Sequence, residues 1–204
     1  MLIVGLTGSL GMGKTTAAAH LRARGLPVFD ADAEVHRLYA TIAAPLIEEA
    51  FPGVTRDGKV DRDKLAARLV AEPARFTELE AIVHPLVRAS ERAFLNEEAA
   101  RGTEIAVLEI PLLFETGADA KVDATIVVSA PAEMQRRRLL SREGFDEQKI
   151  ERLIARQMPD AEKRARADFV VDTEQPIEAT CGRLDEIIAE LQGHRRRAYA
   201  LYWA

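Results

Sequence analysis

Residues 8–15 read Gly-Ser-Leu-Gly-Met-Gly-Lys-Thr and match the pattern G-x-x-x-x-G-K-[ST] in full. An apolar run at residues 1–6 precedes this loop and predicts a strand that is buried on both faces. Residues 15–24 follow it, are rich in helix formers and end before Gly25, so they predict a helix. Glycines between a strand and a helix let backbone N–H groups point at phosphate oxygens, and the helix N-terminus adds partial positive charge. The chain is therefore predicted to bind a nucleoside triphosphate.

Two side chains at the end of the loop have predicted roles. Lys14 is expected to reach the β- and γ-phosphates, and the Thr15 hydroxyl is expected to ligate Mg²⁺. A glycine-rich turn that matches the pattern by chance is the alternative. The strand and the helix on either side disfavour it, because that order is the one that phosphate binding requires.

The composition of the chain argues against several classes of protein. The chain has 204 residues, of which 48% are hydrophobic and 30% charged, as in an ordinary globular protein with one sizeable core. A formal net charge of −5 argues against a general nucleic-acid binder. The single cysteine, Cys181, cannot form an intramolecular disulfide, which favours a cytoplasmic location. No apolar run approaches the roughly 20 residues of a membrane span, so no membrane partner is expected.

The pattern of the chain predicts an α/β fold with a parallel sheet, since strand-like and helix-like segments alternate. The expected strands are residues 1–6, 26–29, 104–110, 124–129 and 169–171. Four expected helices interrupt the alternation, at residues 45–51, 61–70, 73–83 and 85–101. Further helices are expected at residues 131–141, 146–157, 160–167 and 177–192, with an aromatic tail that packs on the body. A run of helices between two strands is typical of a subdomain that covers a substrate.

Asp30-Ala31-Asp32 comes at the end of the second predicted strand. The carboxyl ends of parallel strands open on one edge of a sheet, where ligands bind, so these carboxylates are expected near the phosphate held by Lys14. A carboxylate there can orient an attacking hydroxyl and accept its proton. Aspartate also suits a helix N-cap, and one of the two is expected to serve only as a cap.

Arginines are dense between Gln135 and Arg142. Arg138 and Arg142 are four residues apart and share one face of the predicted helix. Guanidinium groups suit phosphate oxygens, and phosphoryl transfer needs positive charge where negative charge spreads. A solvated charged face is the alternative, but the segment is interpreted as a lid over ATP with a hinge at Gly144. The absence of Asn-Lys-x-Asp and Asp-x-x-Gly motifs argues against a GTPase switch.

Taken together, the motifs closely resemble those of the dephospho-coenzyme A kinase family, nearly from end to end. The shared elements are the loop with Thr16, Asp30-Ala31-Asp32, Asp57-Gly58-Lys59, His84-Pro85, Pro111-Leu112-Leu113-Phe114-Glu115, the arginine segment, and Gln157-Met158-Pro159 with Lys163. The loop itself is common to many families. The other elements in this order are much more specific.

This resemblance implies a P-loop kinase fold, with a parallel five-stranded sheet flanked by helices. It further implies a core of residues 1–32, 102–130 and 168–204, a helical acceptor subdomain of residues 33–101 and a lid of residues 131–167. The implied reaction is ATP- and Mg²⁺-dependent phosphorylation of the ribose 3′-hydroxyl of dephospho-coenzyme A, the last step of coenzyme A synthesis. A cytoplasmic monomer is expected, with no nucleic-acid or membrane partner.

The resemblance also implies roles for single residues. Asp32 is similar in position to the catalytic base, Lys14 to the phosphate lysine and Arg138 to the transition-state arginine. His84 and Arg88 fall in the part that resembles the acceptor side, although a histidine before proline is by itself most often a cap or core residue. The residues implied in ATP binding are Gly11, Met12, Gly13, Lys14, Thr15, Thr16 and Arg142.

Three departures and two alternatives accompany the resemblance. Ser9 and Met12 differ from the family's usual residues at variable positions of the loop, where binding should survive. Leu153 stands where an arginine is usual, which leaves open whether Arg152 or Arg156 reaches the nucleotide. Glu109 stands where the family more often has Asp, which puts the water network near Mg²⁺ in doubt. Another small-molecule or nucleoside-monophosphate kinase would share the loop, the acceptor helices and the lid. An ATP-sensing module without transfer activity would not need to keep Asp32 and the arginine lid.

Overall fold

A computed structural model describes residues 1–204 of the chain. The chain forms two compact units, of which the first comprises residues 1–29 and 95–204 and the second residues 30–94. Each unit has its own hydrophobic core. The first unit contains the phosphate-loop motif, and the second contains Asp32, His84 and Arg88.

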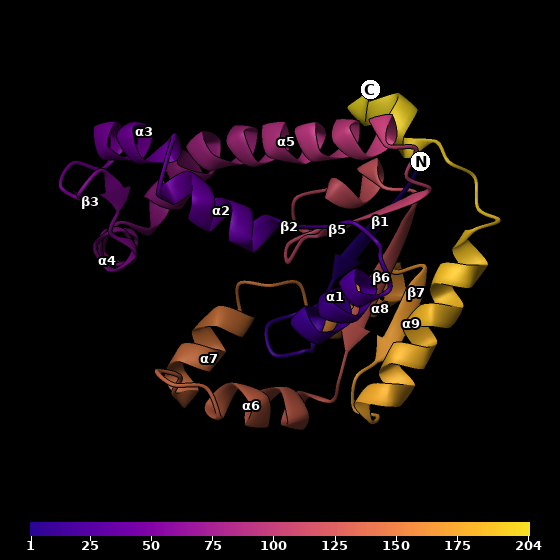
Figure 1. Cartoon of the computed structure of the whole chain (residues 1–204). Coiled ribbons are helices and arrows are strands. Elements are labelled where there is room, and N and C mark those ends of the chain that lie inside the picture. The colour runs from indigo at the N-terminus through magenta and orange to yellow at the C-terminus, as the bar shows by residue number, and fades with distance from the viewer. The chain divides into compact units, whose positions relative to one another are not determined.

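The first unit is built on a five-stranded sheet with the order β2-β5-β1-β6-β7 (Figure 1). The β1–β5, β1–β6 and β6–β7 pairs are parallel. Central β1 is buried along its whole length, as its unbroken apolar sequence predicts. The strands are β1 (Leu2–Thr7), β2 (Val28–Asp30), β5 (Ile105–Glu109), β6 (Ala124–Ser129) and β7 (Phe169–Asp172). The predicted α/β fold with five strands is confirmed.

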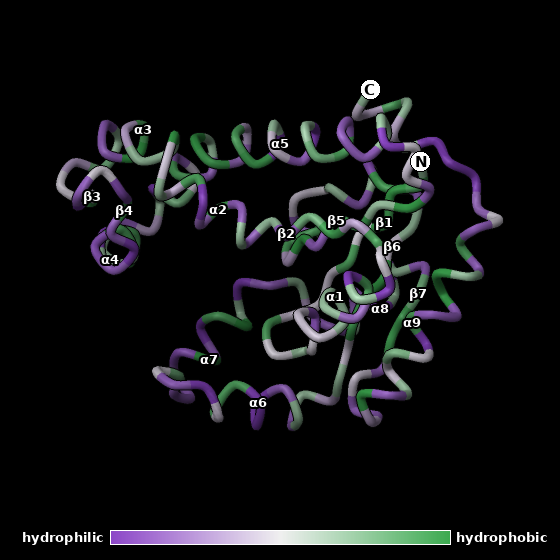
Figure 2. Tube along the Cα trace, viewed as in Figure 1, coloured by the Kyte–Doolittle hydropathy of each residue, from purple (hydrophilic) through white to green (hydrophobic).

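Helices cover this sheet. α1 (Lys14–Ala23) packs against α9 (Ile177–Leu191), α9 also lies along β7, and α8 (Asp160–Arg166) contacts β6 (Figure 1). α6 (Ala132–Leu140) and α7 (Glu147–Ile154) contact each other within the segment that the sequence predicts to be a lid. Figure 2 shows the strands of the sheet mostly in green, the hydrophobic end of the scale. No helix of the chain combines the length and the apolar character that a membrane span needs.

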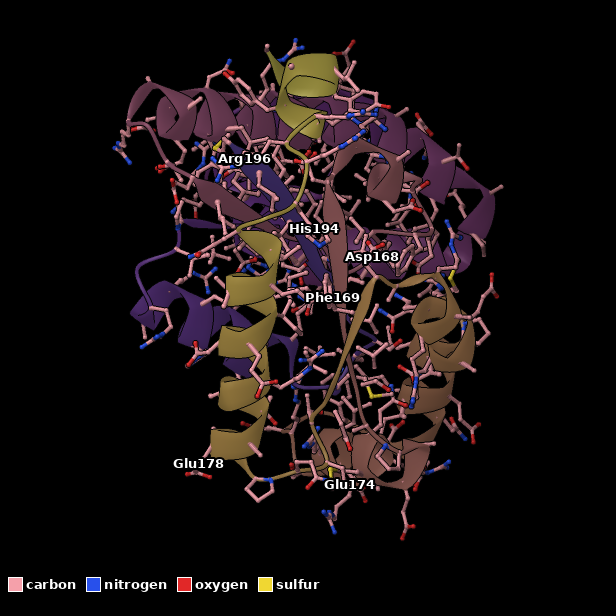
Figure 3. The ribbon with its side chains drawn as sticks, turned by 90° about the vertical axis from the view of Figure 1, so that its right-hand side faces the viewer. Asp168, Phe169, Glu174, Glu178, His194 and Arg196 are labelled. Carbon is pink, nitrogen blue, oxygen red and sulfur yellow. The ribbon has the colours of Figure 1, made fainter.

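The aromatic tail packs on the first unit, as the sequence predicts. Its last turn is a π-helix (Tyr199–Trp203). The indole Nε1 of buried Trp203 donates to the carbonyl of Lys121, at the end of the 3₁₀ turn Ala118–Lys121, over 2.8 Å. Before this turn the chain passes β7, where the His194 ring lies 6.1 Å from that of Phe169 (Figure 3). The tail is therefore part of the fold.

The second unit is a cluster of helices with one small hairpin. Its elements are α2 (Ala31–Tyr39), α3 (Ala43–Ala50), β3 (Thr55–Arg56), β4 (Lys59–Val60), α4 (Arg62–Ala71), the 3₁₀ turn Pro73–Arg75 and the first part of α5 (Phe76–Ala100). The hairpin turns at Asp57 and Gly58, which have positive φ angles of 52° and 72°. α4 lies where a helix is predicted at residues 61–70, and Asp61 caps it, because its carboxylate accepts from Lys64 N over 3.3 Å.

The prediction of two separate helices at residues 73–83 and 85–101 is wrong. After the short turn Pro73–Arg75, a single helix α5 of 25 residues runs through Pro85. Proline removes one backbone hydrogen bond and disfavours a helix by about 3 kcal/mol. Leu79 and Val83 are buried in the core of the second unit, so packing of the residues before the proline opposes that penalty.

Candidate active site

The loop between β1 and α1 has the backbone shape that its glycines predict. Gly11 and Gly13 have φ angles of 81° and 91°, in the region that L side chains rarely adopt. A Cβ atom on Gly8 would lie 2.6 Å from the carbonyl oxygen of Val128, which is closer than two such atoms can approach. The glycines are thus required both by dihedral angle and by the close approach of β6.

In the loop, the Met12 carbonyl is hydrogen-bonded within the protein, whereas several backbone N–H groups are not. The Thr173 hydroxyl, buried after the end of β7, donates to the carbonyl of Met12 over 2.8 Å. That carbonyl shares a trans peptide unit with the N–H of Gly13, so the N–H points the opposite way. No protein acceptor takes the backbone N–H of Gly11, Gly13, Lys14 or Thr15. These amides, at the start of α1, are free to hold an anion.

Met12, Thr15 and Thr16 have different environments in this loop. The Met12 side chain is buried, and its sulfur accepts from Ala130 N over 3.2 Å, so only its backbone belongs to the binding surface. Thr15 and Thr16 are exposed in the first turn of α1, where Thr15 offers a hydroxyl oxygen to a hard cation. No three or more His, Cys, Asp or Glu side chains are grouped as a metal site.

Lys14 lies beside the carboxyl end of β5. Its ammonium is 3.1 Å from Oε1 of Glu109, and Arg22 of α1 is 3.3 Å from the second oxygen. The Glu109 side chain is only 4% exposed, and a buried carboxylate is stable as an anion only when paired. Glu109 therefore fixes the Lys14 ammonium next to the loop, and the departure from Asp keeps a carboxylate at this position.

The arginine segment divides into three environments. Arg136 Nε donates to Glu147 Oε2 of α7 over 2.6 Å; this bond is the largest cause that raises the pKa of the guanidinium above its ordinary value. Arg138 Nη1 donates to the Thr173 hydroxyl over 3.0 Å and approaches the carbonyl of Gly11. Arg142 is exposed beyond the end of α6. The structure thus brings Arg138 to the loop, leaves Arg142 in solvent and uses Arg136 to join α6 and α7.

Thr173 is a site residue that reasoning from the sequence missed. It connects three parts of the first unit, since its hydroxyl contacts Met12, Arg138 and the Ser129 carbonyl. In Figure 3 its neighbour Glu174 lies at the far end of β7 from Asp168, at the carboxyl edge of the sheet. The available signal was its position directly after a buried parallel strand, where ligand sites gather.

The Pro111–Glu115 motif holds α8, near the end of residues 131–167, on the core. Lys163 of α8 is completely buried, and its ammonium lies 3.1 Å from the carbonyl of Pro111 and 2.9 Å from Oε1 of Glu115. Thr7 Oγ1, at the end of β1, donates to the same carbonyl over 3.1 Å. The motif is therefore more than packing: it supplies the acceptors that a buried ammonium needs.

Removal of this ammonium should destabilise the first unit. We expect Lys163→Ala to lower the free energy of unfolding by about 3 kcal/mol, because it leaves Glu115 without its buried partner. In a chain of this size that corresponds to a drop in Tm of roughly 6–12 °C. The matched control is Arg183→Ala, which breaks an exposed pair with Glu186 and should change stability by less than about 1 kcal/mol. Equal urea midpoints for the two variants would contradict this assignment.

The carboxylates of Asp30 and Asp32, both in the second unit, differ in their hydrogen bonding. The Asp30 carboxylate accepts from Ala33 N over 2.9 Å and caps α2, which begins at Ala31. Asp32 is exposed in the first turn of that helix, and no protein hydrogen bond or ion pair occupies its carboxylate. Asp30 is therefore a helix cap, and the carboxylate of Asp32 has no hydrogen-bond partner within the protein.

His84 and Arg88 lie one turn apart on one face of α5, His84 partly buried and Arg88 exposed. The pKa of Glu34 on α2 is lowered, chiefly by a hydrogen bond from Arg37 and in part by one from Ser90 of α5. α2 and α5 also contribute to the same hydrophobic core, which contains Leu38, Leu79 and Val83. The second unit therefore carries all three residues on two helices that touch.

The comparisons with known families agree with one another. The profile of the family described as dephospho-CoA kinase matches residues 2–178. A dephospho-CoA kinase of Mesorhizobium japonicum is 53% identical over 195 residues, covering 96% of this chain and 99% of that protein. One of Bradyrhizobium diazoefficiens is also 53% identical, over 94% of this chain and 96% of its own length.

Solved structures show the same fold. A Thermus thermophilus protein has a TM-score of 0.80 and 38% identity, covering 94% of this chain and 98% of that one. The dephospho-CoA kinase of Campylobacter jejuni has a TM-score of 0.64, but at 20% identity, over 93% of this chain and 96% of that one, it shows the fold alone. A shikimate kinase from Aquifex aeolicus, at 0.51 and 19% identity over 94% and 97%, does so more distantly.

Proposed function

The chain belongs to the dephospho-CoA kinase family, and we propose that it transfers the γ-phosphoryl group of ATP to the ribose 3′-hydroxyl of dephospho-coenzyme A. The observation that carries the proposal is the hydrogen bonding of the phosphate loop. Several of its backbone N–H groups have no acceptor within the protein, whereas the Met12 carbonyl accepts from Thr173. The alternative of a binding module without transfer activity gains no support, since no hydrogen bond or ion pair within the protein uses the Asp32 carboxylate.

In the proposed reaction, the Asp32 carboxylate accepts the proton of the 3′-hydroxyl as the oxygen attacks the γ-phosphorus, and the bond from that phosphorus to the ADP oxygen breaks. Lys14 and the loop amides hold the β- and γ-phosphates. Arg138, which borders the loop at Thr173, stabilises the negative charge that spreads over the transferred group. His84 and Arg88 on α5 contact the acceptor.

Mg²⁺ fits the donors of this site. The exposed Thr15 hydroxyl at the start of α1 would hold it together with phosphate oxygens, which are the hard ligands that this ion prefers. When bound, the ion neutralises phosphate charge. Residues 131–167, proposed as a lid, contribute Arg142 to ATP binding and exclude water from the transfer step. The protein is proposed to act as a cytoplasmic monomer without nucleic-acid or membrane partners.

The substrate class is tested with a panel of acceptors. ATP turnover is measured by a coupled assay with dephospho-coenzyme A, AMP, CMP and shikimate in parallel. We expect the highest kcat/KM with dephospho-coenzyme A, because AMP and CMP present a ribose 3′-hydroxyl without the remote contacts of the full acceptor and shikimate presents no ribose. Turnover on a nucleotide or on shikimate, with none on dephospho-coenzyme A, would assign the chain to another acceptor.

A further inference from the structure

Leu10 of the phosphate loop has both of its backbone polar groups held by glutamine side chains. Gln135 Nε2, on α6, donates to the Leu10 carbonyl over 2.7 Å. The Leu10 N–H donates to Oε1 of Gln157, which lies between α7 and α8, over 2.9 Å. The two glutamines come from the two ends of residues 131–167, and no other hydrogen bond links these glutamines to the chain through their side chains.

Burial makes the Gln135 contact specific. Gln135 is only 5% exposed and lies one turn before fully buried Leu139, on the apolar face of α6. A primary amide removed from water needs a partner, and an apolar residue would serve packing better. The backbone partners also fix the orientation of each amide, because a carbonyl requires the NH₂ group and an N–H requires the oxygen.

The geometry of the peptide unit shows what these contacts do. The Leu10 carbonyl and the Gly11 N–H belong to one planar trans peptide and point in opposite directions. By holding the carbonyl, Gln135 directs the N–H of Gly11 to the side of the free loop amides. Gln157 fixes the preceding peptide unit in the same way, through its N–H. Gly11 has no side chain to restrain its backbone, so these two bonds supply the restraint.

We propose that Gln135 and Gln157 are positioning residues of the phosphate loop: they set the orientation of the Gly11 amide and join the loop to both ends of the lid segment. This inference rests on the proposed ATP binding at the loop. It gives the lid segment a role in the affinity for triphosphate that is independent of its arginines. Any displacement of α6 or of the Gln157 region then changes the direction of a phosphate-binding amide.

The test compares two substitutions that add the same charge and have nearly the same shape. Gln157→Glu keeps an oxygen that can accept from Leu10 N, whereas Gln135→Glu replaces the donor to Leu10 O by a second acceptor. Affinity for ATP with Mg²⁺ is measured by calorimetry on the full chain, and thermal unfolding is recorded for each variant. We expect Gln135→Glu to weaken ATP binding by about three- to tenfold more than Gln157→Glu does, the effect of one lost hydrogen bond.

Two apolar variants complete the experiment. Gln135→Met and Gln157→Met each remove one bond, and their combined effect on ATP affinity should be smaller than the product of the single effects, because both act through Leu10. Gln157 is only partly buried, so its variants decide the question even where a Gln135 variant does not fold. Equal affinities for both Glu variants, or a parental affinity for Gln157→Met, would overturn the proposal. ATP binding by the parent protein keeps this outcome separate from a failure of the proposed function.

Discussion

We expect the Asp32→Asn variant to bind ATP as the parent does and to lose a factor of about 10²–10⁴ in kcat, the contribution of a general base. Asparagine has nearly the same shape as aspartate but cannot accept a proton from the attacking hydroxyl. Asp32 is exposed, and no hydrogen bond or ion pair within the protein uses its carboxylate, so the substitution should leave the fold unchanged. The loss should therefore be confined to the chemical step.

The neighbouring aspartate provides the matched control. Asp30 caps α2 through Ala33 N, and asparagine caps a helix about as well as aspartate does. Asp30→Asn should thus keep kcat within about twofold, since a cap exchange of this kind changes stability by only tenths of a kcal/mol. Steady-state kinetics and calorimetric titration with ATP are measured on both variants. If Asp32→Asn turned over like the parent, Asp32 would be no base and the proposed mechanism would be wrong.

The second large effect is expected at Lys14. We expect Lys14→Ala to weaken ATP binding by about 10–100-fold, the loss of a hydrogen bond from a charged group, and to lower kcat by roughly 10²–10³. The lysine contacts the phosphates in the ground state and stabilises charge in the transition state, so both parameters should fall. Calorimetry gives the affinity, and the coupled assay gives kcat.

Lys14→Ala also removes a partner of buried Glu109, and the control separates this effect from phosphate binding. Arg22→Ala removes the other cation of Glu109, but Arg22 lies about 12 Å further along α1 at 1.5 Å per residue. We expect Arg22→Ala to keep ATP affinity within about threefold, because it makes no phosphate contact. Comparable losses in the two variants would indicate that Glu109, and not phosphate, needs the lysine.

Local sequence predicted the parts of the site that are local in structure. The loop, its strand and its helix follow from one uninterrupted segment, and so does the helix predicted at residues 61–70, which is α4. The same reasoning failed at Pro85, where the penalty of a proline is local but the packing that opposes it comes from the core of the second unit. Propensity therefore located the helices of this unit but not all of their ends.

Long-range contacts are what the sequence could not show. Four arginines in a short segment look alike, and only the fold pairs Arg136 with α7 and brings Arg138 to Thr173. For Lys163 and for Gln135 the sequence held one indication of a role, which is that a polar residue stands at a position that faces a core. Such a residue requires a partner, but the partner of Gln135 lies 125 residues away along the chain. The chemistry of a buried polar residue can thus be expected from sequence, whereas its partner cannot.

The position of the transferred phosphate on the product is the most direct test of the proposed reaction. The protein is incubated with ATP, Mg²⁺ and dephospho-coenzyme A, and the purified product is examined by ³¹P NMR and mass spectrometry. The proposed mechanism requires one new phosphomonoester on the ribose 3′-hydroxyl, with one ADP formed for each product molecule. Phosphate on another hydroxyl, or inorganic phosphate as the only product, would contradict it.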